Sequence, residues 1–157
     1  MSARGWSATR TTLIVITIAG LVTDAIVHFN LASAFAGNKT SVLSEADIFR
    51  IDASVAIVAA VALAVRPRRY TAAFAFLVAA AGTAAVLVYR YVDVGAFGPI
   101  PNMYDPYWQP VGKVLSAVGE AIATVTAFAL FVMLHRRADS PTRDAVAGGP
   151  SAAHTAG

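Results

Sequence analysis

Residues 48–89 read IFRIDASVAIVAAVALAVRPRRYTAAFAFLVAAAGTAAVLVY, two long apolar stretches separated only by RPRR. About 20 mostly apolar residues are needed for a helix to cross a bilayer core about 30 Å thick. Backbone groups cannot stay unpaired in lipid, so stretches of this kind are expected to be helical. Because the connection is so short, residues 48–65 and 70–89 are predicted to be antiparallel neighbours.

Two further apolar stretches flank this hairpin, at residues 11–29 and 111–134. Together the four stretches predict an all-α fold, an integral membrane four-helix antiparallel bundle that occupies residues 11–135. Residues 1–10 are expected to form a short N-terminal arm. Residues 136–157 are small, polar and interrupted by glycine and proline, a composition typical of a disordered tail.

The overall composition agrees with a membrane protein. Of the 157 residues, 57% are hydrophobic and 13% are charged, whereas about a quarter of the residues of an ordinary soluble domain are charged. A water-soluble domain with a single core is therefore excluded. The chain has no cysteine, which excludes disulfides, thiolate nucleophiles and cysteine-based metal centres.

The basic residues predict the orientation of the bundle. One side of the predicted membrane carries eight of them: Arg4, Arg10, Arg66, Arg68, Arg69, Arg136, Arg137 and Arg143. The other side carries Lys39, Arg50, Arg90 and Lys113. By the positive-inside rule both termini and the RPRR turn are expected in the cytoplasm. The net charge of +3 is explained by this asymmetry, and no nucleic-acid partner is implied.

The composition of the spans indicates a cellular location, and the first span has one alternative interpretation. The alanine-rich layout of four spans is similar to that of small membrane proteins of high-GC bacteria, which implies a multi-pass protein of the bacterial plasma membrane. Alternatively, residues 1–10 and the apolar run after them are a signal peptide, cleaved at residues 32–34 or 34–36. The continuation of the apolar run to Phe29, with Asp24 and His28 inside it, favours a retained helix.

Polar side chains inside the predicted spans are the candidate site. Asp24, His28, Asp52 and Glu120 all fall in the outer half of the membrane, where charged groups must face the bundle interior or water. Asp24 and His28 are four residues apart and share a helix face, and Ser116 lies on the same face as Glu120. The spacing predicts a polar pocket, open to the outside, that binds a ligand or protons.

Residues around this pocket have two interpretations each. Three basic residues either line its rim or form ion pairs that fix the helix register: Arg50, Arg90 and Lys113. Three aromatic residues of the loop at residues 91–110 either close the pocket as a lid or anchor the loop at the membrane interface: Tyr104, Tyr107 and Trp108. Residues 44–47, SEAD, predict a capping box at the start of a helix, and Arg50 is expected to pair with Asp47.

Several functions fit these residues. The first is a non-enzymatic module of the cell envelope that binds a ligand or partner, with the lipid bilayer, a second copy or another membrane protein as its partners. The second is a small proton-coupled carrier that uses the intramembrane acids as titrating groups. The third is a membrane enzyme with a metal at Asp24 and His28, since carboxylates and imidazole are ligands of divalent ions. The sequence requires no cofactor, and it contains no recognisable set of catalytic residues such as a Ser/His/Asp triad.

Overall fold

The structure is a computed structural model that describes the backbone of residues 3–147 and the side chains of residues 7–137. It is all-helical. The main elements are α1 (Ala3–Ala32), α2 (Glu45–Val65), α3 (Arg69–Tyr91) and α4 (Gly112–Ala147), with a short 3-10 helix η1 (Ser33–Phe35) after α1. The four α-helices are long and apolar enough to cross a membrane, as the sequence predicts.

Two of the helices are longer than predicted. Helix α1 already begins at Ala3, and α4 continues to Ala147, so residues 136–147 are helical where a disordered tail was expected. Extending an existing helix adds one hydrogen bond for each residue fixed, and most of residues 135–147 are tolerated in helices. The change to polar residues after residue 134 set the end of the predicted membrane span, but α4 continues beyond it. The rest of the predicted tail, residues 148–157, lies outside the described residues.

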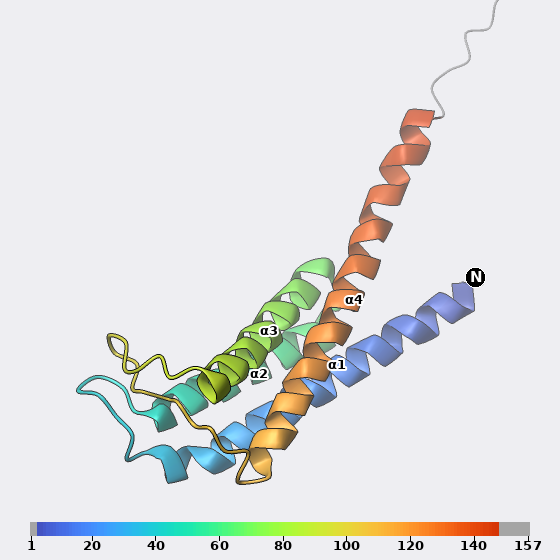
Figure 1. Cartoon of the computed structure of the whole chain (residues 1–157). Helices are drawn as coiled ribbons and strands as arrows, with labels where there is room; N and C mark the ends of the chain where they lie inside the picture. Colours follow the sequence, from blue (N-terminus) through green and yellow to red (C-terminus); the bar gives the residue numbers. More distant parts are fainter. Residues whose placement is uncertain (1–2, 148–157) are drawn as a thin grey trace, which may run out of the picture.

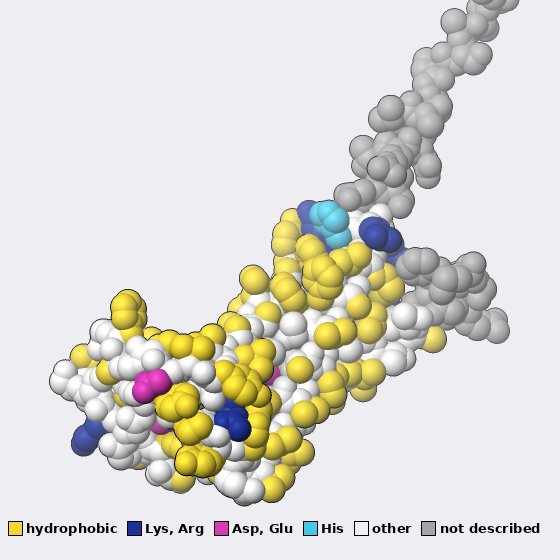
Figure 2. All heavy atoms as spheres, in the orientation of Figure 1, with side chains coloured by type: hydrophobic (Ala, Val, Ile, Leu, Met, Phe, Trp, Pro, Cys, Tyr) yellow, Lys and Arg dark blue, Asp and Glu magenta, His cyan; other side chains and the backbone are white. Residues whose placement is uncertain are grey.

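The helices pack as a bundle around a core of small side chains. Helix α1 contacts both α2 and α4, α3 packs against α4, and fewer contacts join α2 to α3 (Figure 1). Alanines dominate the core, which allows the helix backbones to approach closely. The largest apolar side chains at its centre are Leu21, Leu63 and Leu130. On the face shown in Figure 2, hydrophobic side chains cover much of the bundle, while lysines and arginines lie towards its ends.

Polar contacts place the connections at two opposite ends. At one end, Arg10 Nη2 donates a hydrogen bond of 2.8 Å to the carbonyl of Pro67 in the turn between α2 and α3. At the other end the two longer loops meet, where Thr40 donates to the carbonyl of Pro99 over 2.8 Å. The RPRR turn and the start of α1 therefore share one end of the bundle, as the orientation argument requires.

The predicted capping box opens α2. The Ser44 hydroxyl accepts from the backbone N–H of Asp47 over 3.1 Å, and the Asp47 carboxylate accepts from the backbone N–H of Ser44 over 3.1 Å. The expected pair between Arg50 and Asp47 also forms, with 3.2 Å between Nη1 and Oδ1. These local bonds fix where α2 begins, and they therefore set the depth of the residues that follow it.

Helices α1 and α4 approach each other closely at Gly20 and Gly119. A Cβ atom added at Gly20 would lie 2.5 Å from the Gly119 carbonyl oxygen and 3.0 Å from the Ala123 Cβ. Neither is the end of a flexible side chain, so the helices would have to separate. This contact brings the parts of α1 and α4 that carry Asp24 and Glu120 together.

We expect Gly20→Ala to lower the free energy of unfolding in detergent by about 1 kcal/mol, because overpacking outweighs the gain in helix propensity. Thermal unfolding followed by circular dichroism measures it. Gly37→Ala is the control, since a Cβ atom there meets nothing within 4 Å. Equal unfolding temperatures for the two variants would contradict the close α1–α4 contact.

Candidate functional site

A cavity of about 160 Å³ lies at the end of the bundle where the two longer loops meet. It is bounded by the last turns of α1 and α3, by the first turns of α2 and α4, and by the loop that connects α3 to α4. Its walls include aromatic rings from three of these segments: Phe49, Tyr89, Tyr107 and Trp108. Polar side chains lie at its base. This combination of apolar walls and a few polar groups is typical of ligand sites.

The structure brings the four predicted site residues together. One ligand atom from each of Asp24, His28, Asp52 and Glu120 lies within 4.8 Å of all the others. The His28 Nδ1 atom is 2.6 Å from Asp24 Oδ1 and 3.6 Å from Asp52 Oδ2. Asp24 and Glu120 are each only 2% exposed. We call these four residues the acid–histidine cluster.

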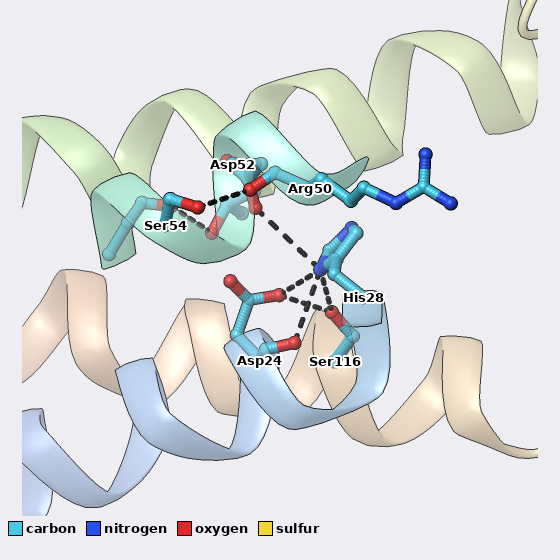
Figure 3. Close-up of polar contacts among 8 residues, drawn as sticks. Asp24, His28, Arg50, Asp52, Ser54 and Ser116 are labelled. Carbon is cyan, nitrogen blue, oxygen red and sulfur yellow. Dashed lines mark hydrogen bonds and ion pairs between the residues drawn. The ribbon is translucent and has the colours of Figure 1, made fainter. Parts of the chain in front are cut away.

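Ser116 connects α4 to this cluster (Figure 3). Its hydroxyl donates a hydrogen bond of 2.5 Å to Asp24 Oδ1 and lies 3.3 Å from His28 Nδ1. The other side of the imidazole meets the edge of Phe49, with 4.9 Å between the ring centroids. Asp24 and His28 therefore have fixed positions. The sequence placed Ser116 on the correct face of α4 through its spacing from Glu120, but it gave no reason to include this residue in the site.

Glu120 occupies space that Gly82 leaves open on α3. A Cβ atom at position 82 would overlap the Glu120 carboxylate. Glu120 Oε2 and Asp52 Oδ2 are both buried without a hydrogen-bond partner. Among residues 7–137, no lysine or arginine forms an ion pair with a carboxylate of the acid–histidine cluster. In the described residues Asp24 therefore pairs with His28, and the ion pairs of Arg50 and Lys113 are with Asp47 and Asp105 instead.

Two of the three predicted rim residues line the cavity. Lys113 forms an ion pair with Asp105 of the loop, and its ammonium lies 4.8 Å from the centre of the Phe35 ring. The Arg90 guanidinium lies over the Trp108 ring at 5.0 Å. Arg50 does not reach the cavity, and Figure 3 shows its side chain pointing away from His28. The reason is geometric, because a helix turns about 200° over the two residues that separate Arg50 from Asp52.

Two of the three residues predicted to form either a lid or an interfacial anchor lie at the cavity. Tyr107 and Trp108 line the cavity, whereas Tyr104 is outside it and 38% exposed. The loop is held by its own polar contacts, such as the bond of 3.0 Å from the Asp105 N–H to the Tyr89 carbonyl. Burial alone would raise the pKa of Asp105, but the hydrogen bonds from Lys113 and from the Tyr107 N–H, together with the charges of Lys113 and Arg90, outweigh it, and the pKa lies below its ordinary value. Asp105 is therefore a charged anchor between the loop and α4.

Two acidic lining residues were not expected at the site. Glu45 was explained as a residue of the α2 N-terminus, yet it lines the cavity, is 6% exposed and accepts a hydrogen bond of 2.7 Å from Asn38. Asp105 belongs to a loop whose path the sequence does not specify. No local pattern marks either residue, because each reaches the cavity through contacts between distant segments.

The arrangement offers carboxylate and imidazole groups at the base of a pocket, with positive charge nearer its mouth. Such groups can bind a cation or hold protons. No protein-family model matches this chain, and no curated protein or solved structure is detectably similar to it.

Proposed function

We propose that this chain is a multi-pass protein of the bacterial plasma membrane that binds a small ligand at its outer end, as a non-enzymatic module of the cell envelope. The observation that carries the proposal is the cavity itself, whose walls are aromatic and apolar and whose base holds buried polar groups. Pockets of this composition are where ligands bind preferentially in proteins. The distribution of basic residues supports a cytoplasmic location for both termini.

The size of the cavity limits the ligand. A volume of about 160 Å³ is close to that of the roughly 150 Å³ cavity that accommodates benzene in an engineered protein. The ligand is therefore an ion, a molecule of benzene-like size, or one group of a larger molecule or partner. Tyr107 and Trp108 would cover such a ligand from the loop side, and this gives the predicted lid a role.

The packing on the other side of the acid–histidine cluster favours binding over transport. A carrier needs polar groups along its whole route, but the described core beyond the cluster contains Leu21, Leu63 and Leu130, all nearly fully buried. The hydroxyls of Thr17 and Thr126, which also lie there, are 2.8 Å apart and bond to each other. A pocket that ends on a packed apolar core suits a module that holds its ligand.

Filling the pocket tests this function. Val86 lines the cavity, while its neighbour Leu87 is 50% exposed and is not a lining residue. We expect native mass spectrometry of protein extracted gently from membranes to show a bound small species in the parent and in Leu87→Trp. The same species should be lost from Val86→Trp, in which the indole occupies the cavity. The absence of any bound species from the parent, or its retention in Val86→Trp, would contradict the proposal.

A further inference from the structure

We propose that the acid–histidine cluster is a binding site for a divalent transition-metal ion of the Zn²⁺ or Mn²⁺ class. The inference names the ligand chemistry at the base of the pocket and so rests on the proposed function. Four potential ligands from three helices, α1, α2 and α4, converge there.

The geometry suits one shared ion. Bonds from Zn²⁺ to nitrogen and oxygen are about 2.0–2.2 Å, so the ligand atoms of a tetrahedral site lie about 3.4 Å apart. The four ligand atoms of the cluster lie within 4.8 Å of one another. Side-chain rotations that shorten the longest of these separations by up to about 1.4 Å would therefore close the site. The His28 Nδ1 atom already points among the carboxylates, where it contacts both Asp24 and Asp52.

Two unsatisfied oxygens independently indicate a cation. Glu120 is 98% buried, since its exposed fraction is 2%, and its Oε2 has no hydrogen-bond partner. Asp52 Oδ2 is also buried without a hydrogen bond, and it lies 3.6 Å from His28 Nδ1. Buried polar atoms are nearly always bonded, and the exceptions need an explanation such as an ion. The cluster brings three carboxylates together without an arginine or lysine partner in the described side chains, and a divalent ion would compensate their repulsion.

The surroundings hold the ligands as metal sites require. Ser116 donates to Asp24, Phe49 packs against the His28 ring, and Gly82 leaves room for the Glu120 carboxylate. Such outer contacts orient ligands and raise metal affinity. The donor set of oxygen atoms with one imidazole nitrogen suits Zn²⁺ or Mn²⁺, while Cu(I) prefers sulfur and Ca²⁺ prefers oxygen alone.

Titration of the full chain with Zn²⁺ tests the site. The protein, in detergent and treated with a chelator, is expected to bind one Zn²⁺ by isothermal titration calorimetry. We expect His28→Gln and Glu120→Gln to weaken binding about tenfold or more, because each removes a direct ligand and loss of even an outer contact has an effect of this size. Asp93→Asn is the matched control, since Asp93 is an exposed acid in the loop at the same end of the bundle but lies outside both the cavity and the cluster, and the Zn²⁺ affinity of this variant should stay unchanged.

A glycine substitution separates loss of binding from loss of folding. Gly82→Ala keeps every ligand but displaces the Glu120 carboxylate, which is the end of a flexible side chain and can move. We expect it to keep the parent's circular dichroism spectrum and to bind Zn²⁺ about tenfold more weakly. Gly37→Ala, at an open position, should match the parent in both measurements.

The outcomes distinguish this inference from the proposed function. Absence of Zn²⁺ binding by the folded parent, or equal affinity in the parent, Glu120→Gln and Gly82→Ala, would overturn the metal site while leaving the pocket-filling test unaffected. A parent that binds Zn²⁺ through the cluster but carries no species sensitive to Val86→Trp would uphold the metal site and overturn the wider ligand-binding function.

Discussion

Replacing Glu120 with glutamine is expected to stabilise the metal-free protein. The Glu120 side chain is 2% exposed, its Oε2 has no hydrogen-bond partner, and its carboxylate lies close to those of Asp24 and Asp52. Glutamine has nearly the same shape, removes one negative charge and brings an NH₂ group that can donate to a neighbouring carboxylate. We expect the free energy of unfolding to rise by about 2 kcal/mol, the scale associated with an unsatisfied buried group.

Thermal unfolding in detergent with excess chelator measures this effect, and Asp47→Asn is its control. Asp47 is also an acid near the outer end, but its carboxylate caps α2 and pairs with Arg50. Its neutralisation should lower stability by up to about 1 kcal/mol, since a helix cap and an exposed ion pair are weakened. If Glu120→Gln unfolded at a lower temperature than the parent, the carboxylate would be a structural element and the functional interpretation would fail.

A stabilising substitution at this position has a functional meaning. Proteins retain groups that reduce stability mainly where activity needs them, so a gain on removing a carboxylate marks a binding site. Saturating Zn²⁺ should narrow this difference by about 1.4 kcal/mol or more, because Glu120→Gln binds the ion about tenfold or more weakly and the stabilisation follows the binding. The unfolding temperatures of the parent and of Glu120→Gln, each measured with and without Zn²⁺, therefore report both the stability gained without metal and the stability gained from Zn²⁺ binding.

The helices and much of the site could be predicted because the relevant signals are local. Length and hydropathy identify the four long helices, and the residues around Ser44 predict the start of α2. The helical rise places Asp24, Asp52 and Glu120 at similar depths, and the four-residue spacing puts His28 beside Asp24. Since charged groups inside a membrane must face inward, similar depth was enough to predict that these side chains meet.

The parts that could not be predicted depend on rotation and on long-range contacts. Depth does not determine which way a helix faces, so Arg50 remained a candidate for the rim although it does not line the pocket and pairs with Asp47. Gly82 contributes to the site because it has no side chain and so leaves room for the Glu120 carboxylate, and sequence patterns do not reveal such room. The loop positions of Tyr104 and Asp105 depend on contacts with α3 and α4, and no local rule specifies them.

The proposed orientation of the bundle predicts which of two introduced cysteines can be labelled from outside the cell. The chain has no cysteine, so a single introduced thiol is its only site for a maleimide. We expect Val42→Cys, at a loop position that is 69% exposed, to react with a membrane-impermeant maleimide on intact spheroplasts of a bacterial host. Ser151→Cys, in the C-terminal segment, should react only after lysis. The cysteine-free parent controls for labelling of other groups.

The charges of the RPRR turn provide the physical test of this orientation. Replacing Arg66, Arg68 and Arg69 with glutamine removes three of the eight basic residues on the predicted inner side. By the positive-inside rule, part of the population should then insert the other way, with Ser151→Cys becoming reactive from outside. Labelling of Ser151→Cys on spheroplasts without these changes would contradict the orientation. The acid–histidine cluster would then open to the cytoplasm, and its metal ion would have to come from the cytoplasmic pool.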